Sequence, residues 1–272
     1  MQVWELATGK MVGAFVDRNP IKDWPGVRWT PDEALALRIL PTAVHIFTGK
    51  PFAHVPIYRI NQPGISVARF SPIAPYKVAT FIAEKKGKPA LITAYRHGEY
   101  EGKPMFRQNF FNAQSGVLKW SPSGQYLIAH FRTDQDKSGG SYYGKSSAQL
   151  INIARKGGSA VMFPHPVHDI AWAPHKDEFV VIYGSKPYCT ELYDGLGKLI
   201  GKLSTEKRNQ VEWSPHGRFF CVGAFGSMQG HIDFFDRDTL KNLGSTQVGT
   251  SSTNWHTPNN RSRIWKGCCV WS

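Results

Sequence analysis

The sequence predicts an all-β protein of the β-propeller class, because one short motif recurs at a spacing close to the length of a propeller blade. In each copy an aromatic residue is followed by a small residue and a proline. The steps between the aromatic residues are 41, 50, 52 and 41 residues. One four-stranded blade takes about 40 to 50 residues, so the longer steps leave room for loop insertions. The copies begin at Trp29, Phe70, Trp120, Trp172 and Trp213.

The chemistry of the motif suits the point where a strand ends in a tight turn. We expect the aromatic residue at the end of a strand to bury its large apolar surface against the next blade. Proline fixes φ at the first central turn position, and glycine permits positive φ before the chain returns. Gly124 and Gly217 stand where this glycine is needed.

Further strands are predicted by short apolar or alternating runs that end near an acidic residue or a glycine turn. Each is expected to be the third strand of a blade, followed by a hairpin to the outer strand. The runs cover residues 3–5, 44–47, 192–194 and 232–236. The repeat that starts at Val211 shows the whole order, with strands at 211–213, 219–224 and 232–235. No stretch has helical periodicity beyond a turn or two.

About five complete blades and partial ones account for the chain. The run at 3–5 corresponds to the third strand of a blade whose first two strands are absent, and no sixth motif follows Thr250. We therefore expect residues 1–253 to form an incomplete ring of blades, a piece of a larger propeller, and residues 254–272 to form an irregular tail.

Composition points to a folded protein with a basic surface. Hydrophobic residues make up 41% of the 272 residues, and the formal net charge is +13. An excess of this size attracts phosphate backbones in a salt-dependent way, although simple solubility is the alternative. The chain has no apolar run long enough to cross a bilayer and no signal peptide pattern. Its four cysteines show no CxxC spacing, which fits a reducing compartment such as the cytosol and argues against a zinc site.

Basic side chains gather in segments that we expect to be loops between strands, where they reach a phosphate without a burial cost. Tyr95, Tyr100 and Phe106 lie among them and are candidates for base stacking. Solvated loop charge is the alternative for each cation. The RNA or ribosome-binding candidates in these segments are Lys85, Lys86, Lys88, Arg96, Lys103, Arg107, Arg155, Lys156, Lys207 and Arg208.

A long insertion loop is predicted over residues 133–147. Its beginning, Asp134 to Gly139, resembles a calcium-binding loop, but position twelve is Lys145 in place of glutamate and no helices flank it. We expect instead a loop that contacts a partner. Its contact candidates are Lys137, Tyr142, Tyr143 and Lys145.

No constellation for catalysis, metal binding or cofactor binding is predicted. His165, His168, Asp169, His175 and Asp177 form the densest cluster of potential ligands, but a His-Asp pair near the start of a blade commonly supports turns. The glycine-rich run 195–201 joins two strands and does not open a helix, so it fails as a phosphate cradle. An enzyme is therefore not expected.

Several runs resemble the propeller of the eukaryotic translation initiation factor 2A family. The most specific is residues 134–144, D-Q-D-K-S-G-G-S-Y-Y-G, because blade chemistry does not demand it. The others are residues 75–79, 215–217 and 224–230. The likeness covers residues 2–253.

The resemblance implies a cytoplasmic, nine-bladed WD-repeat propeller that binds the small ribosomal subunit. It also implies that the protein helps direct initiator methionyl-tRNA to the subunit in a codon-dependent, GTP-independent way. Messenger RNA and other initiation factors are further expected partners, and a membrane is not. Against this resemblance, we expect the sequence to lack N-terminal blades, the blade after residue 253 and a charged helical C-terminal extension. The alternative function is a propeller that serves as a protein-interaction scaffold within initiation complexes.

Overall fold

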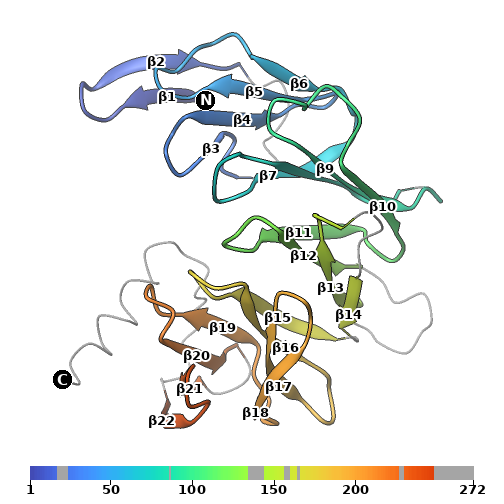
Figure 1. Ribbon diagram of the computed structural model, residues 1–272, viewed down its shortest axis with the longest axis vertical. Coiled ribbons are helices and arrows are strands. Elements are labelled where there is room, and N and C mark those ends of the chain that lie inside the picture. The colour runs from blue at the N-terminus through green and yellow to red at the C-terminus, as the bar shows by residue number, and fades with distance from the viewer. Residues whose placement is uncertain are drawn as a thin grey trace. The chain divides into compact units, whose positions relative to one another are not determined.

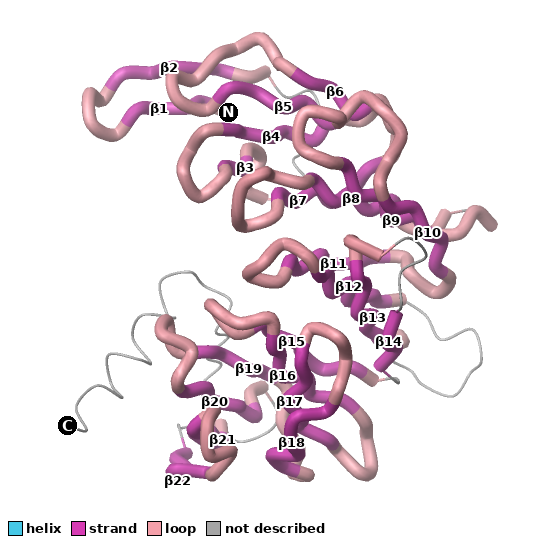
Figure 2. The backbone as a smooth tube through the Cα atoms, viewed as in Figure 1, coloured by secondary structure: helices cyan, strands magenta, loops and turns pink. Residues whose placement is uncertain are grey.

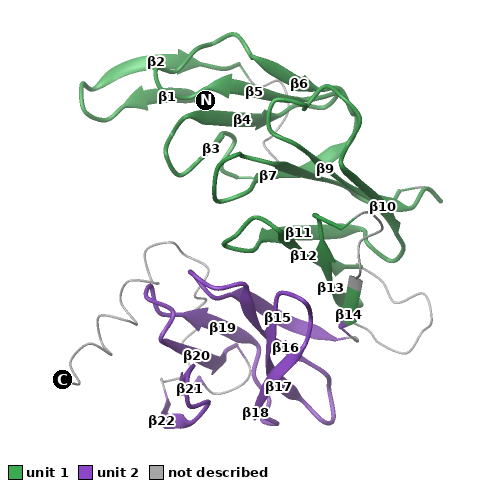
Figure 3. Cartoon of the chain, viewed as in Figure 1, with its two compact units in different colours: residues 1–162 green, residues 163–272 purple. Residues whose placement is uncertain are grey.

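Antiparallel β-sheets make up all the regular structure in the described part of the chain. The computed structural model describes residues 1–16, 24–85, 87–133, 144–155, 160–163, 166–226 and 230–247. Its elements are strands connected by turns and loops (Figures 1 and 2). Two compact units, Met1–Met162 and Phe163–Ser272, divide the chain (Figure 3). The all-β prediction is confirmed, whereas the predicted tail at 254–272 lies outside the described residues.

The first unit contains a two-stranded hairpin and three four-stranded sheets. Within each four-stranded sheet, strands that follow one another in sequence pair antiparallel. The hairpin pairs β1 (Gln2–Glu5) with β2 (Lys10–Ala14). The four-stranded sheets comprise β3 (Arg28–Trp29), β4 (Leu35–Ile39), β5 (Val44–Thr48) and β6 (Tyr58–Ile60); β7 (Ile65–Phe70), β8 (Val78–Ile82), β9 (Ala90–Tyr95) and β10 (Phe106–Phe110); and β11 (Ser115–Trp120), β12 (Tyr126–Arg132), β13 (Ser146–Asn152) and β14 (Ala160–Phe163).

The second unit repeats the same meander twice. The predicted third strands at 192–194 and 232–236 fall in β17 (Cys189–Asp194) and β21 (His231–Asp236), each of which is third in its sheet. The run at 44–47 likewise falls in β5. The two sheets comprise β15 (Val167–Trp172), β16 (Glu178–Tyr183), β17 (Cys189–Asp194) and β18 (Leu199–Ser204); and β19 (Gln210–Trp213), β20 (Phe219–Ala224), β21 (His231–Asp236) and β22 (Asn242–Gln247).

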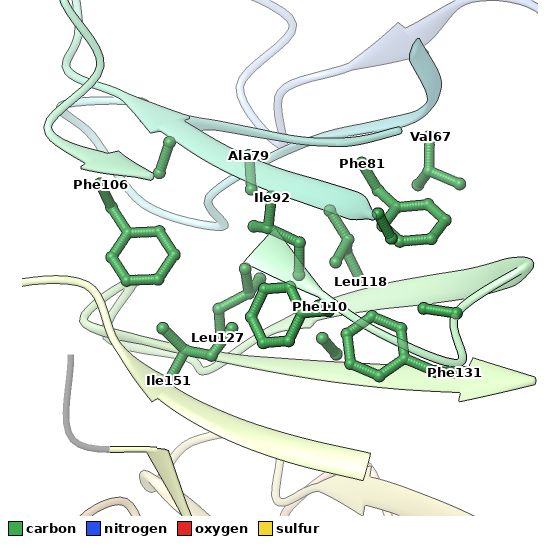
Figure 4. Packing of buried hydrophobic residues seen from close by; sticks show 14 of the residues in the cluster. Val67, Ala79, Phe81, Ile92, Phe106, Phe110, Leu118, Leu127, Phe131 and Ile151 are labelled. Carbon is green, nitrogen blue, oxygen red and sulfur yellow. The ribbon is translucent and has the colours of Figure 1, made fainter. Parts of the chain in front are cut away.

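Burial decreases from the inner strands of a sheet to its last strand. Inner strands such as β8 and β16 are almost continuously apolar and buried, as expected of strands covered on both faces. In the first unit, side chains of two neighbouring sheets interdigitate: Phe81 of β8 and Phe110 of the last strand β10 pack near Phe131 of β12, whose ring lies 5.1 Å from that of Phe110 (Figure 4). In contrast, all six residues of β22 are exposed. The last strand and the loops are thus the parts of a sheet open to partners.

The recurrent motif occupies one position in all five four-stranded sheets. Its aromatic residue is the last residue of the first strand in each sheet, and the proline turn connects this strand to the second. The small residue closes the turn: the Ser214 hydroxyl accepts a hydrogen bond from Phe219 N at 3.1 Å, and Ser121 accepts one from Tyr126 N at 3.2 Å. Gly124 and Gly217 have φ of 64° and 70°, which confirms their predicted role.

Two of the motif aromatics, Trp120 and Trp213, contact the preceding sheet and not the next one, contrary to the expectation. Trp120 packs against a cluster built from the sheet before it, with Phe81 and Ile92, and from its own sheet. Its Nε1 donates a hydrogen bond to the Arg69 carbonyl at 3.1 Å. The indole N–H needs a partner when the ring is covered, and the carbonyl on the neighbouring first strand supplies it.

Candidate nucleic-acid interface

Antiparallel pairing gives every four-stranded sheet two ends that carry different loops. The motif end carries the turn between the first and second strands and the loop between the third and fourth. The opposite end carries the loop between the second and third strands and the connection from the fourth strand to the next sheet. Each basic segment can therefore be assigned to one end.

Neighbouring sheets of the first unit have their motif ends side by side. Lys77 Nζ, in the turn after β7, donates a hydrogen bond to the Gly124 carbonyl in the turn after β11 at 2.8 Å. A Cβ on Gly124 would lie 3.1 Å from Ser71 Cβ, so the two turns are in close contact. Burial lowers the pKa of Lys77, which is consistent with a structural contact. In the second unit, His175 Nε2 donates to the Pro215 carbonyl at 2.9 Å and joins its motif turns similarly.

The opposite end of the first unit carries the β8–β9 hairpin, with Lys85 and Lys88 both exposed. Lys145, just before β13, is half-buried at this end, and its N–H donates to Thr133 Oγ1 at 2.8 Å. Of the other candidates expected here, Lys86, Lys137, Tyr142 and Tyr143 lie outside the described residues. The structure therefore supports an exposed basic hairpin at this end.

At the opposite end of the second unit, two candidates that are adjacent in sequence differ in exposure. Lys207 is exposed. Arg208 is not, because its side chain is 11% exposed and its Nη2 lies 2.7 Å from Asp233 Oδ2. Asp233 also accepts a hydrogen bond from Ser245 at 2.7 Å. Arg208 thus belongs to a buried ion pair, whereas Lys207 remains available to a ligand.

The motif end of the first unit carries the remaining cations. Arg96 and Lys103 are exposed in the β9–β10 loop, and Arg96 lies 3.7 Å from Glu99. Arg155 is exposed after β13, and Lys156 lies outside the described residues. Arg107 is exposed but lies within β10, so the expectation that all the candidates lie in loops is wrong for this residue.

The aromatic residues expected to stack on bases are core residues. Tyr95, Tyr100 and Phe106 are only 6%, 0% and 7% exposed. Tyr100 anchors the β9–β10 loop, since its hydroxyl donates to the Tyr76 carbonyl and its ring contacts Tyr58 edge-on. Burial raises the pKa of Tyr100. These three rings cannot stack on a base. The contacts of Tyr100 instead anchor the basic β9–β10 loop to the core.

Phe111 was not singled out from the sequence as an exposed aromatic residue. Phe111 is 74% exposed and directly follows β10, while its neighbour Phe110 is 6% exposed. The alternation of a strand places adjacent residues on opposite faces, so a Phe-Phe pair at a strand end is a signal that one ring faces solvent.

The described members of the histidine and aspartate cluster make structural hydrogen bonds to the backbone: His168 and His175 to loop carbonyls, and Asp169 to a strand N–H. His168 Nε2 donates to the Gly184 carbonyl at 2.8 Å, and Asp169 Oδ2 accepts a hydrogen bond from Val211 N at 3.0 Å. His165 lies outside the described residues. No group of three metal-ligating side chains occurs within the described ranges. The same ranges contain no helix that could cross a membrane.

A second buried polar network in β16 and β17 is also structural. Tyr183 and Tyr193 both donate to Glu191 Oε2, at 2.7 and 2.6 Å. Burial and this hydrogen bond raise the pKa of Tyr193 to about 12. The tyrosines thus satisfy a carboxylate whose side chain is 6% exposed.

Comparison with known proteins confirms the class that the repeated sheets define. A eukaryotic initiation factor whose crystal structure is known shares 30% identity with a TM-score of 0.77, over 91% of this chain and 59% of that one. The protein has a β-propeller fold, and its four-stranded sheets are blades.

Residues 108–262 match the family described as eukaryotic translation initiation factor eIF2A. Eukaryotic translation initiation factor 2A of Dictyostelium discoideum is 34% identical over 233 residues, 83% of this chain and 37% of that protein. The Schizosaccharomyces pombe relative is 33% identical over 238 residues, 87% of this chain and 41% of that protein. This chain belongs to the eukaryotic translation initiation factor 2A family, and it spans about two fifths of the length of these relatives.

Proposed function

We propose that the protein is a non-enzymatic initiation factor that binds the small ribosomal subunit. In this proposal it helps direct initiator methionyl-tRNA to the subunit in a codon-dependent, GTP-independent manner. The observation that carries the proposal is the set of exposed cations at both ends of the blades in a chain of net charge +13. Membership of an initiation factor family supports it.

The exposed cations suit a phosphate-rich partner. Lys85, Lys88 and Lys207 each lie at the end of a sheet opposite its motif turn. Arg96 and Lys103 lie at a motif end. Long cationic side chains on loops reach phosphates and release condensed counterions. The subunit, initiator tRNA, messenger RNA and other initiation factors are the proposed partners, all in the cytoplasm.

Binding to purified small ribosomal subunits at increasing salt tests the proposal. We expect the affinity to fall steeply between about 50 and 200 mM salt, as it does when several phosphates are neutralised. An affinity that is flat over this range would contradict phosphate contact. Recruitment of initiator methionyl-tRNA to subunits is then measured with and without a start codon, in the absence of GTP; no recruitment would contradict the tRNA role.

Charge reversal identifies the surface. The variant Lys85→Glu, Lys86→Glu, Lys88→Glu should weaken subunit binding, and the variant Lys10→Glu, an exposed lysine in β2, is the control. Unchanged binding by the triple variant would remove the hairpin from the proposed surface.

A protein-interaction scaffold is the second candidate. The outer strands of the second unit support it, because Leu199, Ile200 and Leu243 are 39%, 38% and 58% exposed and offer apolar contacts on strands β18 and β22. Partner proteins recovered with the tagged chain after nuclease treatment would favour this function. Recovery that requires intact ribosomal RNA would favour the first.

A further inference from the structure

Phe111 stands out among the aromatic residues of its sheet because its ring faces solvent. Tyr95, Tyr100 and Phe106 of β9, β10 and their connecting loop are buried in the core, whereas Phe111 is 74% exposed. Exposed rings are common as single surface residues, so exposure alone does not indicate a site. The backbone that holds Phe111 and the charges beside it provide the further evidence.

The loop that carries Phe111 is fixed. Asn112 has φ of 56°, a left-handed conformation that few residues other than glycine adopt and that asparagine tolerates. Ala113 is 0% exposed, and it exchanges two hydrogen bonds with Glu84: Glu84 N donates to the Ala113 carbonyl at 2.9 Å, and Ala113 N donates to Glu84 Oε2 at 3.2 Å. A ring held on such a loop loses little conformational freedom when a ligand binds.

The same hydrogen bonds join this loop to the basic hairpin. Glu84 directly precedes Lys85, and the Lys85 and Lys88 backbones bond to each other at 3.1 and 3.0 Å around Gly87. Phe110 pairs with Ala90, so Phe111 lies at the level of the residues that follow Lys88. Figure 2 shows β8, β9 and β10 side by side, with the β8–β9 hairpin beyond β10. The backbones of Phe111 and of the two exposed lysines therefore lie at the same end of one sheet.

A third cation lies at the same end of the neighbouring sheet. Arg132, the last residue of β12, is exposed and pairs with Ser115, four residues after Phe111. The Glu84 carboxylate accepts a hydrogen bond from the buried Ala113 N–H. Among the residues that the structure describes at this end, the exposed cations Lys85, Lys88 and Arg132 outnumber this carboxylate.

We propose that Phe111, Lys85 and Lys88 form a binding site for single-stranded RNA, in which a base stacks on the Phe111 ring and the lysines contact the flanking phosphates. A π-face combined with adjacent cations fits single-stranded nucleic acid, whereas an acidic peptide would use only the charges. Stacking without a base-reading hydrogen bond makes the site tolerant of base sequence. This inference rests on the proposed RNA-binding function and deepens it.

Fluorescence anisotropy with labelled oligouridine and the full chain tests the site. Loss of a stacking ring should weaken affinity roughly 5- to 150-fold, so Phe111→Ala should fall in this range while Phe111→Trp retains binding. In the double variant Lys85→Gln, Lys88→Gln, the slope of log affinity plotted against log salt concentration should become shallower by about 1.4. Each phosphate contact to a single strand contributes about 0.7 to this slope. Trp4→Ala, which removes a ring 53% exposed in β1, should leave affinity unchanged.

The outcomes separate this site from the broader function. Unchanged oligouridine affinity in Phe111→Ala, or no oligouridine binding by the unmodified protein, overturns the site even if subunit binding persists. Failure of the unmodified protein to bind subunits overturns the proposed function instead. Polyglutamate of matched charge is the comparison ligand: if Phe111→Ala weakens its binding as much as that of oligouridine, the ring is not a stacking platform and the site is overturned.

Discussion

The indole Nε1 of Trp213 donates a hydrogen bond to the backbone carbonyl of Ala171 at 3.2 Å. Ala171 directly precedes the motif aromatic of the sheet before, and Trp120 makes the same contact with Arg69, which precedes Phe70. Each of these indoles therefore joins the first strands of two successive sheets. The motif that reveals the repeat also holds neighbouring repeats together.

Substitution of Trp213 should separate the contribution of this hydrogen bond from that of the ring. Trp213→Phe keeps most of the apolar surface and should cost about 1 kcal/mol of unfolding free energy. Trp213 is only 7% exposed, so Trp213→Ala leaves a cavity in the core. It should lower the free energy of unfolding by about 3 to 5 kcal/mol. Urea denaturation followed by tryptophan fluorescence and circular dichroism measures both. Equal losses in the two variants would show that the ring contributes nothing beyond its N–H.

The buried motif hydroxyl gives a second stability test. Ser214 accepts a hydrogen bond from Phe219 N at 3.1 Å and is 6% exposed. Ser214→Ala should lower stability by about 1 kcal/mol, because the Phe219 N–H loses this partner. Ser115→Ala, at an exposed hydroxyl 3.4 Å from a carbonyl, should change stability by less than about 0.5 kcal/mol. Similar losses at both positions in thermal unfolding would contradict the proposed role of the motif.

Asp236 should make stability depend on acid. Its pKa is lowered mainly by the hydrogen bond from Thr239 N, at 3.1 Å, and further by Arg218 Nη2 at 2.9 Å. Because the folded pKa lies below the unfolded value, the ionised group stabilises the fold above about pH 4, and this contribution is lost as the pH falls through the folded pKa.

Asp236→Asn should therefore be less stable than the unmodified protein at pH 7, and the difference should shrink toward pH 3. Denaturant midpoints at several pH values measure it, with exposed Glu206→Gln as the control. A difference that stays constant from pH 7 to pH 3 would show that the charge of Asp236 does not stabilise the fold.

The fold was predictable from sequence where one chemical requirement recurs. The aromatic, small residue and proline repeat at every first strand, so the five sheets could be identified. Apolar or alternating runs identified the third strands at residues 44–47 and 232–236. The direction of packing could not, because a tryptophan at a strand end has apolar neighbours on either side. Only the carbonyls of Arg69 and Ala171 show that the ring contacts the preceding sheet.

The candidate site was less predictable, because sequence gives charge but not the partner of each charge. Tyr100 lies among cations in sequence, yet its ring fills the core and its hydroxyl binds the Tyr76 carbonyl. Phe111 lies beside a core phenylalanine in sequence, yet its ring faces solvent. In both cases strand register and the neighbouring sheet decide the outcome, and neither is encoded locally.

Lys207 and Arg208 allow this distinction to be measured on adjacent residues. Arg208→Gln leaves Asp233, whose side chain is 7% exposed, without its cation and should cost about 3 to 5 kcal/mol of stability. Lys207→Gln should leave stability within about 0.5 kcal/mol and flatten the salt dependence of RNA binding by less than about one unit of slope. Urea denaturation and anisotropy with oligouridine measure the two effects. If Arg208→Gln kept full stability and lost RNA affinity, the Arg208 guanidinium would bind RNA and not stabilise the fold through Asp233.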